Sequence, residues 1–359
     1  MNNNFMAILK AARRENASDI HIIAGLPPAF RVSGEIILAN SDKMARVDCQ
    51  SLIYGLLSEV QKKHLEETRE LCFSTEDQTA GRLRITVYYH SGSPEMAIRL
   101  CATEMKSAED LCLPPIVDEL ARKPNGLVLV TGPTGVGKTT TLNYMIDLIN
   151  RERRCKIVTI EDPIEYVHQR KKAIIVQQEV YTDCLSFSKA LRHVLRQDPD
   201  IIVIGEMRDL ETVGTALTAA ETGHLVMATL HTPNVAQTVE RIVGVFPADQ
   251  QQQITLQLAN SLQGVIAQDL LPVAGGKGLI LAYEVMVASN AVRNIIRENN
   301  LHQLNNAIQT GRKDGMVTMD QSLADLYQQG KITYDIAVSK ARSTDLFHRP
   351  QTPKRNMEW

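Results

Sequence analysis

A glycine-rich segment at residues 126–139 carries the residue types that bind nucleotide phosphates. It reads GLVLVTGPTGVGKT, an apolar run followed by the spacing G-x-x-x-x-G-K-T and then by a helical pattern. In that context backbone N–H groups can turn inward around the phosphates, and the N-terminus of the next helix adds positive potential. Lys138 is expected to reach the β- and γ-phosphates, and the Thr139 hydroxyl is expected to ligate Mg²⁺. The predicted nucleotide-binding residues are Gly132, Pro133, Thr134, Gly135, Val136, Gly137, Lys138, Thr139 and Thr140.

Carboxylates follow two other apolar runs. The run 200–204 leads to Gly205 and Glu206. Many nucleotide hydrolases have an Asp where Gly205 stands, so that acidic role is either displaced onto Glu206 or supplied by the sequence TIEDPIE at residues 159–165. We predict that Glu161 activates water and that Glu206 supports Mg²⁺, with the reverse assignment left open. Asp162 is a further candidate Mg²⁺ ligand, whereas Glu165 is better explained as a solvated helix residue.

Histidines and arginines complete the set of candidate residues. The apolar run GHLVMATLHT at residues 223–232 has a histidine at each end. We predict that His231, at the carboxyl end, senses the γ-phosphate, and that His224 is structural or lies at a subunit contact. No arginine of the same half stands in an obvious catalytic position. The candidates that could act in trans are Arg82, Arg84 and Arg99, although a solvated strand face explains Arg82 and Arg84 equally well.

The elements that must position these residues fall into two parts. Residues 1–105 mix helical patterns at 5–14 and 52–67 with alternating strand patterns at 19–24, 29–38, 82–89 and 96–100, which predicts an α+β domain. Residues 106–125 are predicted to be a linker with a short helix. At 126–290, apolar runs alternate with helical segments, which predicts an α/β domain with a mainly parallel sheet. One Gln-rich helix is expected to place Ile254, Leu258, Leu262 and Ile266 on one face. Residues 291–342 are predicted to be a helical subdomain, and 343–359 a flexible tail.

Composition excludes several classes of protein. The 359 residues contain 39 Lys and Arg against 41 Asp and Glu, a formal net charge of −2, and only 4% are aromatic. This balance argues against a nucleic-acid motor, which needs a basic surface bearing aromatic side chains. The six cysteines form no C-x-x-C pair, and no apolar run reaches the roughly 18 residues that span a bilayer. A cytoplasmic protein with reduced thiols is therefore expected.

Segments along nearly the whole chain resemble the PilT-like type IV pilus retraction ATPases of the secretion ATPase superfamily. The matching segments are ASDIHIIAGLPPAFRVSGEI (17–36), GRLR (81–84), GPTGVGKTT (132–140), TIEDPIEY (159–166), DPDIIVIGEMRDLET (198–212), TALTAAETGHLVMATLHT (215–232), FPADQ (246–250), AVRNIIRE (291–298) and GMVTMDQSLADLYQQGKIT (315–333).

The resemblance implies a PAS-like N-terminal domain, a RecA-like C-terminal ATPase domain and a hexameric ring with ATP and Mg²⁺ between subunits. It implies that ATP-driven domain movements turn an inner-membrane platform protein, so that the pilus retracts. By position, Lys138 and Thr139 match the Walker A motif, Glu161 the acidic box and Glu206 the Walker B motif. His224 and His231 match the His box, in which His224 becomes a nucleotide-site residue, and Arg82, Arg84 and Arg99 match the arginines that reach a neighbour's nucleotide.

The resemblance also has departures and alternatives. Gln178 stands where the family usually has Arg, residues 88–96 differ from the usual sequence, and the tail beyond residue 347 is an extension. The element AVRNIIRE is tied to retraction in the family, and a packing helix with solvated arginines is its simpler explanation. The alternatives are an accessory retraction ATPase, a pilus assembly ATPase and a type II secretion ATPase. The absence of a tetracysteine element argues against the assembly and secretion ATPases. A nucleotide-binding scaffold without turnover is disfavoured by Lys138, Glu161 and Glu206.

Overall fold

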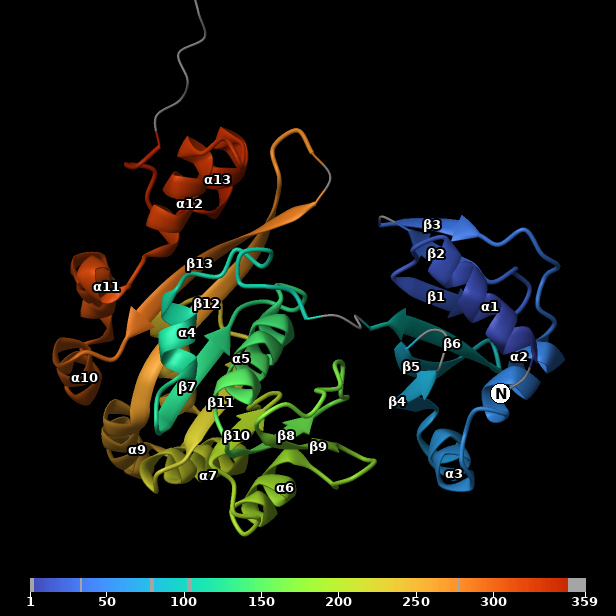
Figure 1. Cartoon of the computed structure of the whole chain (residues 1–359), viewed down its shortest axis with the longest axis horizontal. Helices are drawn as coiled ribbons and strands as arrows, with labels where there is room; N and C mark the ends of the chain where they lie inside the picture. The colour runs from blue at the N-terminus through green and yellow to red at the C-terminus, as the bar shows by residue number, and fades with distance from the viewer. Residues whose placement is uncertain (1–2, 33, 78–80, 102–104, 277, 348–359) are drawn as a thin grey trace, which may run out of the picture. The chain divides into compact units, whose positions relative to one another are not determined.

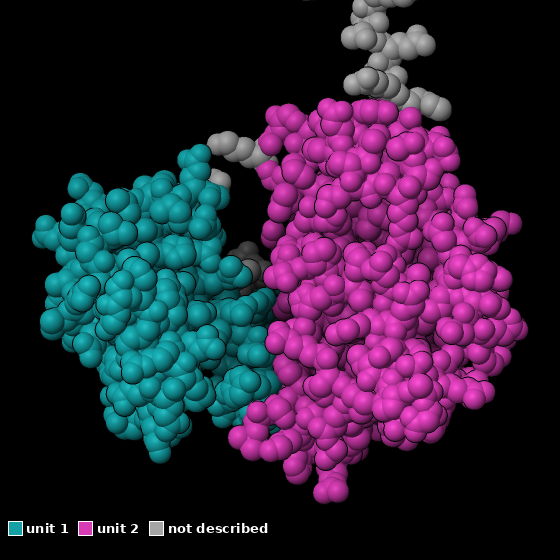
Figure 2. Space-filling model, turned by 180° about the vertical axis from the view of Figure 1, so that it is seen from behind, with its two compact units in different colours: residues 1–105, 161–169, 177–184 teal, residues 106–160, 170–176, 185–359 magenta. Residues whose placement is uncertain are grey.

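The computed structural model describes residues 3–32, 34–77, 81–101, 105–276 and 278–347. By its contacts the chain forms two compact units, coloured separately in Figure 2. Unit 1 comprises Met1–Met105 with the segments Glu161–Gln169 and Gln177–Cys184, and unit 2 comprises Lys106–Ile160, Arg170–Val176 and Leu185–Trp359. The residues predicted as a linker, 106–125, therefore belong to unit 2, where they include helix α4 (Ile116–Ala121). The boundaries predicted at 290 and 342 stay predictions.

Unit 1 is built around an antiparallel sheet in the order β3-β2-β1-β6-β5-β4 (Figure 1). Its strands are β1 (Asp19–Ile22), β2 (Ala29–Val32), β3 (Glu35–Leu38), β4 (Glu70–Asp77), β5 (Gly81–His90) and β6 (Ser93–Leu100). Alternating residues of β5 and several residues of β6 are buried against α1 (Asn3–Arg14) and α2 (Arg46–Tyr54), which places Phe5, Leu83, Ile85 and Ile98 in one core. The burial of these apolar side chains stabilises the α+β arrangement that the strand patterns predict.

The helix predicted at residues 52–67 is wrong as a single element. The chain forms α2, which ends at the C-cap Gly55, and then α3 (Glu59–Thr68). Ser58 begins α3 with a capping box, because its hydroxyl accepts from the Gln61 N–H while the Gln61 side chain accepts from the Ser58 N–H. These two bonds satisfy backbone N–H groups that have no partner within the helix. They therefore favour the start of a new helix at this position over continuation of α2.

Unit 2 contains most of a seven-stranded sheet in the order β13-β12-β7-β11-β10-β8-β9. Strands β7 (Gly126–Thr131), β8 (Lys156–Glu161), β10 (Ile201–Ile204) and β11 (Leu225–Leu230) pair in parallel. Beyond β7 lie β12 (Leu262–Pro272), parallel to it, and β13 (Leu279–Val287), antiparallel to β12. The other edge strand, β9 (Ile174–Glu179), was not anticipated, nor was β4 in unit 1. The mainly parallel α/β fold is confirmed.

Helices connect and flank the strands of this sheet (Figure 1). They are α5 (Lys138–Glu152), α6 (Phe187–Val194), α7 (Leu210–Glu221), α8 (Val235–Gly244), α9 (Ala248–Ser261), α10 (Asn290–Arg297), α11 (Leu304–Thr310), α12 (Met319–Gln328) and α13 (Tyr334–Lys340). Residues 343–347 of the predicted tail are described, and Phe347 is buried in one cluster with Leu323 and Ala337; residues 348–359 lie outside the described residues. Within the described part of the chain, no helix is both long and apolar enough to cross a bilayer.

The helix predicted to carry Ile254, Leu258, Leu262 and Ile266 ends earlier than expected. Helix α9 stops at Ser261, and Leu262 already has extended backbone angles as the first residue of β12. Ile266 is buried in that strand, paired with Val130 of β7. The parallel pairing with β7 satisfies the backbone and buries the same apolar residues, so the tertiary contact overrides the helical spacing.

Candidate functional site

The glycine-rich loop joins β7 to α5, as the spacing predicts. Gly132 follows the strand with a φ of +138°, and a Cβ there would lie 2.4 Å from the backbone oxygen of Gln268. Gly137 is the N-cap of α5 with a φ of +90°. Only glycine adopts both conformations without strain, and only glycine permits the close approach of β12. The loop therefore places Lys138 in the first turn of α5. The N–H groups of this turn have no carbonyl partner within the helix and can bind phosphate oxygens.

Lys138 is buried and bonded to its own loop. Its Nζ donates to the carbonyl oxygens of Gly132 and Pro133, each at 2.8 Å, and lies 3.3 Å from Nδ1 of His231. Burial lowers the pKa of the Lys138 ammonium, and the negative charge of Glu206 opposes that shift. The lysine is thus held at the loop by two neutral acceptors that a phosphate oxygen can replace.

Glu206 and His231 form the other side of this cluster. Nε2 of His231 lies 3.1 Å from Oε1 of Glu206, and Arg208 pairs with Oε2 at 2.7 Å. Nδ1 of the same imidazole is 3.4 Å from the Thr134 hydroxyl. Burial raises the pKa of Glu206, but the hydrogen bond from Arg208 and the neighbouring imidazole outweigh burial and lower it overall. The carboxylate is therefore held in its charged form beside the phosphate-binding loop.

Thr139 and Glu206 are suited to Mg²⁺. Both are hard oxygen donors of unit 2, the Thr139 side chain is exposed at the start of α5, and Glu206 is charged. The donor chemistry fits the ion, although the role of each residue, and that of Asp162, stays a prediction.

His224 occupies the opposite end of β11 from His231. Its Nδ1 lies 3.1 Å from the carbonyl oxygen of Ala219 and 3.4 Å from the Thr222 hydroxyl, so it closes the C-terminus of α7. Its position at the start of the strand favours the structural reading of this histidine over a place in the nucleotide site.

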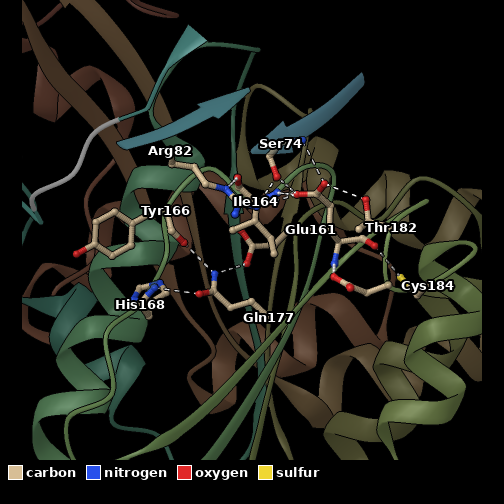
Figure 3. A network of polar contacts seen from close by, with 11 residues as sticks. Ser74, Arg82, Glu161, Ile164, Tyr166, His168, Gln177, Thr182 and Cys184 are labelled. Atoms are coloured by element: carbon tan, nitrogen blue, oxygen red, sulfur yellow. Dashed lines mark hydrogen bonds and ion pairs between the residues drawn. The ribbon is translucent and has the colours of Figure 1, made fainter. Parts of the chain in front are cut away.

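The acidic box consists of residues 159–166. Glu161, the last residue of β8, is the first residue of the box that belongs to unit 1. Its side chain is buried, and Oε1 accepts a hydrogen bond of 2.9 Å from Nε2 of Gln177 (Figure 3). The reading of Glu165 as a solvated helix residue is wrong, because no helix forms there and Glu165 pairs with Arg84 at 3.1 Å.

The three arginines predicted to reach a neighbour's nucleotide are each bonded to a carboxylate of unit 1. Arg82 pairs with Glu179 at 3.0 Å, Arg84 with Glu165, and Arg99 with Asp19 at 3.0 Å. A trans role for them stays a prediction, and it requires these cis pairs to open or to share the guanidinium. The simpler reading, a solvated strand face, does not describe Arg82, whose side chain is mostly buried.

Glu179 is a residue that the sequence analysis missed. Its buried carboxylate accepts from the N–H of Ile164 at 3.1 Å, the Thr182 hydroxyl at 3.1 Å, and the hydroxyl and N–H of Ser74. Arg82 also donates to the carbonyl oxygen of Ile164 at 3.1 Å. Glu179 and Arg82 therefore bind the N–H and the carbonyl oxygen of the same residue of the acidic box (Figure 3). The signal that could have indicated this hub of contacts around Glu179 is a carboxylate at the end of the half-polar segment IIVQQE, which forms β9.

The type II/IV secretion system protein model matches residues 2–339. The chain belongs to this family. It is 43% identical over 340 residues to a type IV pilus retraction ATPase, PilT, of Pseudomonas aeruginosa, covering 95% of this chain and 98% of that protein. It is 37% identical over 341 residues to the type IV pilus ATPase PilU of the same organism, covering 95% and 89%. Among solved structures, the pilus retraction motor PilT with bound ADP superposes with a TM-score of 0.88 at 46% identity, covering 94% of this chain and 97% of that one. The predicted PilT-like resemblance and fold class are therefore confirmed.

The family element AVRNIIRE forms helix α10, and its two arginines differ. Val292 and Ile296 are buried and Ile295 is half-buried, so the helix packs through an apolar edge, as the interpretation as a packing helix requires. Arg293 donates to the carbonyl oxygens of Ala259 and Asn260, each at 2.6 Å, and thereby caps α9. Arg297 is exposed and bonded to Asn294 of its own helix. The interpretation of both arginines as solvated is thus wrong for Arg293.

This difference gives a prediction for stability. Arg293→Ala removes charged donors from the last carbonyls of α9 and is expected to cost about 2 kcal/mol. Arg297→Ala removes an exposed bond and is expected to change stability by less than about 0.5 kcal/mol. Urea midpoints of the two purified variants measure the difference, and equal midpoints would contradict the capping role.

Proposed function

We propose that the chain is the motor ATPase of type IV pilus retraction. It hydrolyses ATP to ADP and phosphate and uses the energy to return pilin to the membrane. The observation that carries this proposal is the phosphate-binding loop with Lys138, His231 and Glu206 gathered at it, in a chain that aligns along nearly its full length with a retraction ATPase.

The residues suggest how the hydrolysis proceeds. The phosphates of ATP replace the carbonyls of Gly132 and Pro133 at Lys138, and the N–H groups at the start of α5 bind phosphate oxygens. Thr139 and Glu206 would hold Mg²⁺, which would supply neutralisation of the phosphate charge. Glu161 orients the attacking water and takes its proton.

His231 is proposed to sense the γ-phosphate, because its imidazole lies within 3.5 Å of both Lys138 and Glu206. Binding of the γ-phosphate adds negative charge near Lys138, on the Nδ1 side of the imidazole, while Glu206 stays bonded to Nε2. We expect His231→Ala to lower ATP turnover at least about tenfold, measured as phosphate release with Mg²⁺. Unchanged turnover would contradict the sensor role.

The working assembly is proposed to be a ring of six copies attached to an inner-membrane platform protein. Arg82, Arg84 and Arg99 would then leave their cis carboxylates to meet nucleotide bound by the adjacent copy. An accessory retraction ATPase is the second candidate. The 37% identity to PilU supports it, and the higher identity of 43% to PilT favours the first candidate.

Deletion of the gene in its host tests the retraction role. We expect cells with more surface pili than the parent and without twitching, restored by the natural chain and not by Lys138→Ala. Pili are counted by electron microscopy and twitching by colony spreading. Bald cells would indicate an assembly motor instead, and cells that still twitch would indicate the accessory role.

A further inference from the structure

One face of β9 contacts the acidic box at two places. Gln177 and Glu179 are two residues apart on the strand, so their side chains leave it on the same side. Glu179 binds the backbone N–H of Ile164, and Gln177 reaches the side chain of Glu161. A backbone bond from Val180 to the carbonyl oxygen of Glu161, 2.9 Å long, runs alongside. The strand and Val180, the residue that follows it, therefore bind both the carboxylate and the backbone of the residue assigned to water activation.

The amide of Gln177 is fixed by three hydrogen bonds (Figure 3). Nε2 donates to Oε1 of Glu161 at 2.9 Å and to the carbonyl oxygen of Tyr166 at 2.8 Å. Oε1 accepts from the backbone N–H of His168 at 2.9 Å. A backbone N–H can only donate and a backbone carbonyl can only accept, so these two partners determine which end of the amide is oxygen. The end that faces Glu161 is consequently a donor.

A neutral donor at this place has a chemical consequence. Glu161 as a whole is only 7% exposed, so the orientation of its carboxylate depends on protein partners more than on water. A cation there would offset the charge that makes the carboxylate a base, and an apolar group would remove a donor from a buried carboxylate. An amide orients the carboxylate and leaves its charge in place.

We propose that Gln177 is a positioning residue that orients Glu161 for water activation. The proposal rests on the role assigned to Glu161 in the proposed function. It separates Gln177 from Gln178, the next residue of β9, whose side chain leaves the opposite side of the strand.

Steady-state ATP hydrolysis by the full chain tests the proposal. Gln177→Met keeps the length of the side chain and cannot donate; we expect kcat to fall about tenfold or more, with KM for ATP and the affinity for ADP within about twofold of the natural chain. Gln177→Glu replaces the donor by a second carboxylate, and we expect its kcat to fall at least as far. This variant provides a second readout if Gln177→Met folds poorly. Gln178→Met is the matched control and is expected to keep kcat within about twofold.

A double-variant cycle distinguishes positioning from a general loss of structure. In a Glu161→Gln background, Gln177→Met is expected to cause no further loss of kcat, because the group it orients is gone. An additive loss, or a Gln177→Met enzyme with the natural kcat, would overturn the proposal. Glu161→Gln with full turnover would overturn both this proposal and the role of Glu161. Loss of turnover in Lys138→Ala, measured in parallel, would still support ATP hydrolysis by this chain.

Discussion

Glu161→Gln is expected to lower kcat for ATP hydrolysis by about 10²- to 10⁴-fold while ADP still binds. The substitution keeps the shape of a buried side chain and removes the only feature that general-base catalysis needs, a carboxylate that can take a proton. Because the ADP complex does not need a base, its affinity is expected to stay within about twofold. Phosphate release under saturating ATP and titration with a fluorescent ADP analogue measure the two quantities.

Glu206→Gln is the companion variant, because the two glutamates could exchange roles. If Glu206 supports Mg²⁺, its amide variant is expected to weaken the binding of Mg²⁺ and so to raise the Mg²⁺ concentration for half-maximal rate. A Glu161→Gln enzyme with nearly natural turnover, together with an inactive Glu206→Gln enzyme at high Mg²⁺, would assign water activation to Glu206 instead.

Glu179→Ala is expected to destabilise unit 1 by about 3 kcal/mol. The variant leaves Arg82 mostly buried without its carboxylate and removes the acceptor of the Ile164 N–H and the Thr182 hydroxyl. Unpaired buried donors of this kind account for much of such a loss. Urea titration followed by far-ultraviolet circular dichroism, read at the first transition, measures the change.

Glu165→Ala is the control for that measurement. Its pair with Arg84 is about one-third exposed on both sides, with side-chain exposures of 34% and 33%. Solvent screening limits such a pair to less than about 1 kcal/mol. If both variants unfold at the same urea concentration, the hub around Glu179 does not stabilise the unit as its contacts indicate.

The sequence was sufficient where function depends on consecutive residues. The loop from Gly132 to Thr139 needs glycines at fixed spacing between a strand and a helix, and the structure has that arrangement. The placing of His231 and Glu206 near Lys138 follows from parallel strands whose carboxyl ends share one edge of a sheet. Local pattern and topology together predicted this cluster.

The sequence was insufficient where function depends on which distant residues meet. Arg82 and Glu179 are 97 positions apart, and several carboxylates were equally plausible partners for each arginine. The edge strand β9 has only six residues and a half-polar pattern, IIVQQE, so neither its existence nor the face of Gln177 could be deduced from periodicity. For the same reason Leu262 was assigned to the wrong element, since pairing with β7 decided its conformation.

The assignment of residues 161–169 and 177–184 to unit 1 limits how this protein can be cut and recombined. A fragment that starts at Lys106 would retain Glu179 and lose Ser74 and Arg82, so this buried carboxylate would keep its bonds to Ile164 and Thr182 and lose the others. A chimera that exchanges only the first 105 residues with a relative would pair one protein's arginines with the other's acceptors. A chimera between members of the family therefore has to exchange all three segments of unit 1 together, because the residues of this unit are not contiguous along the gene.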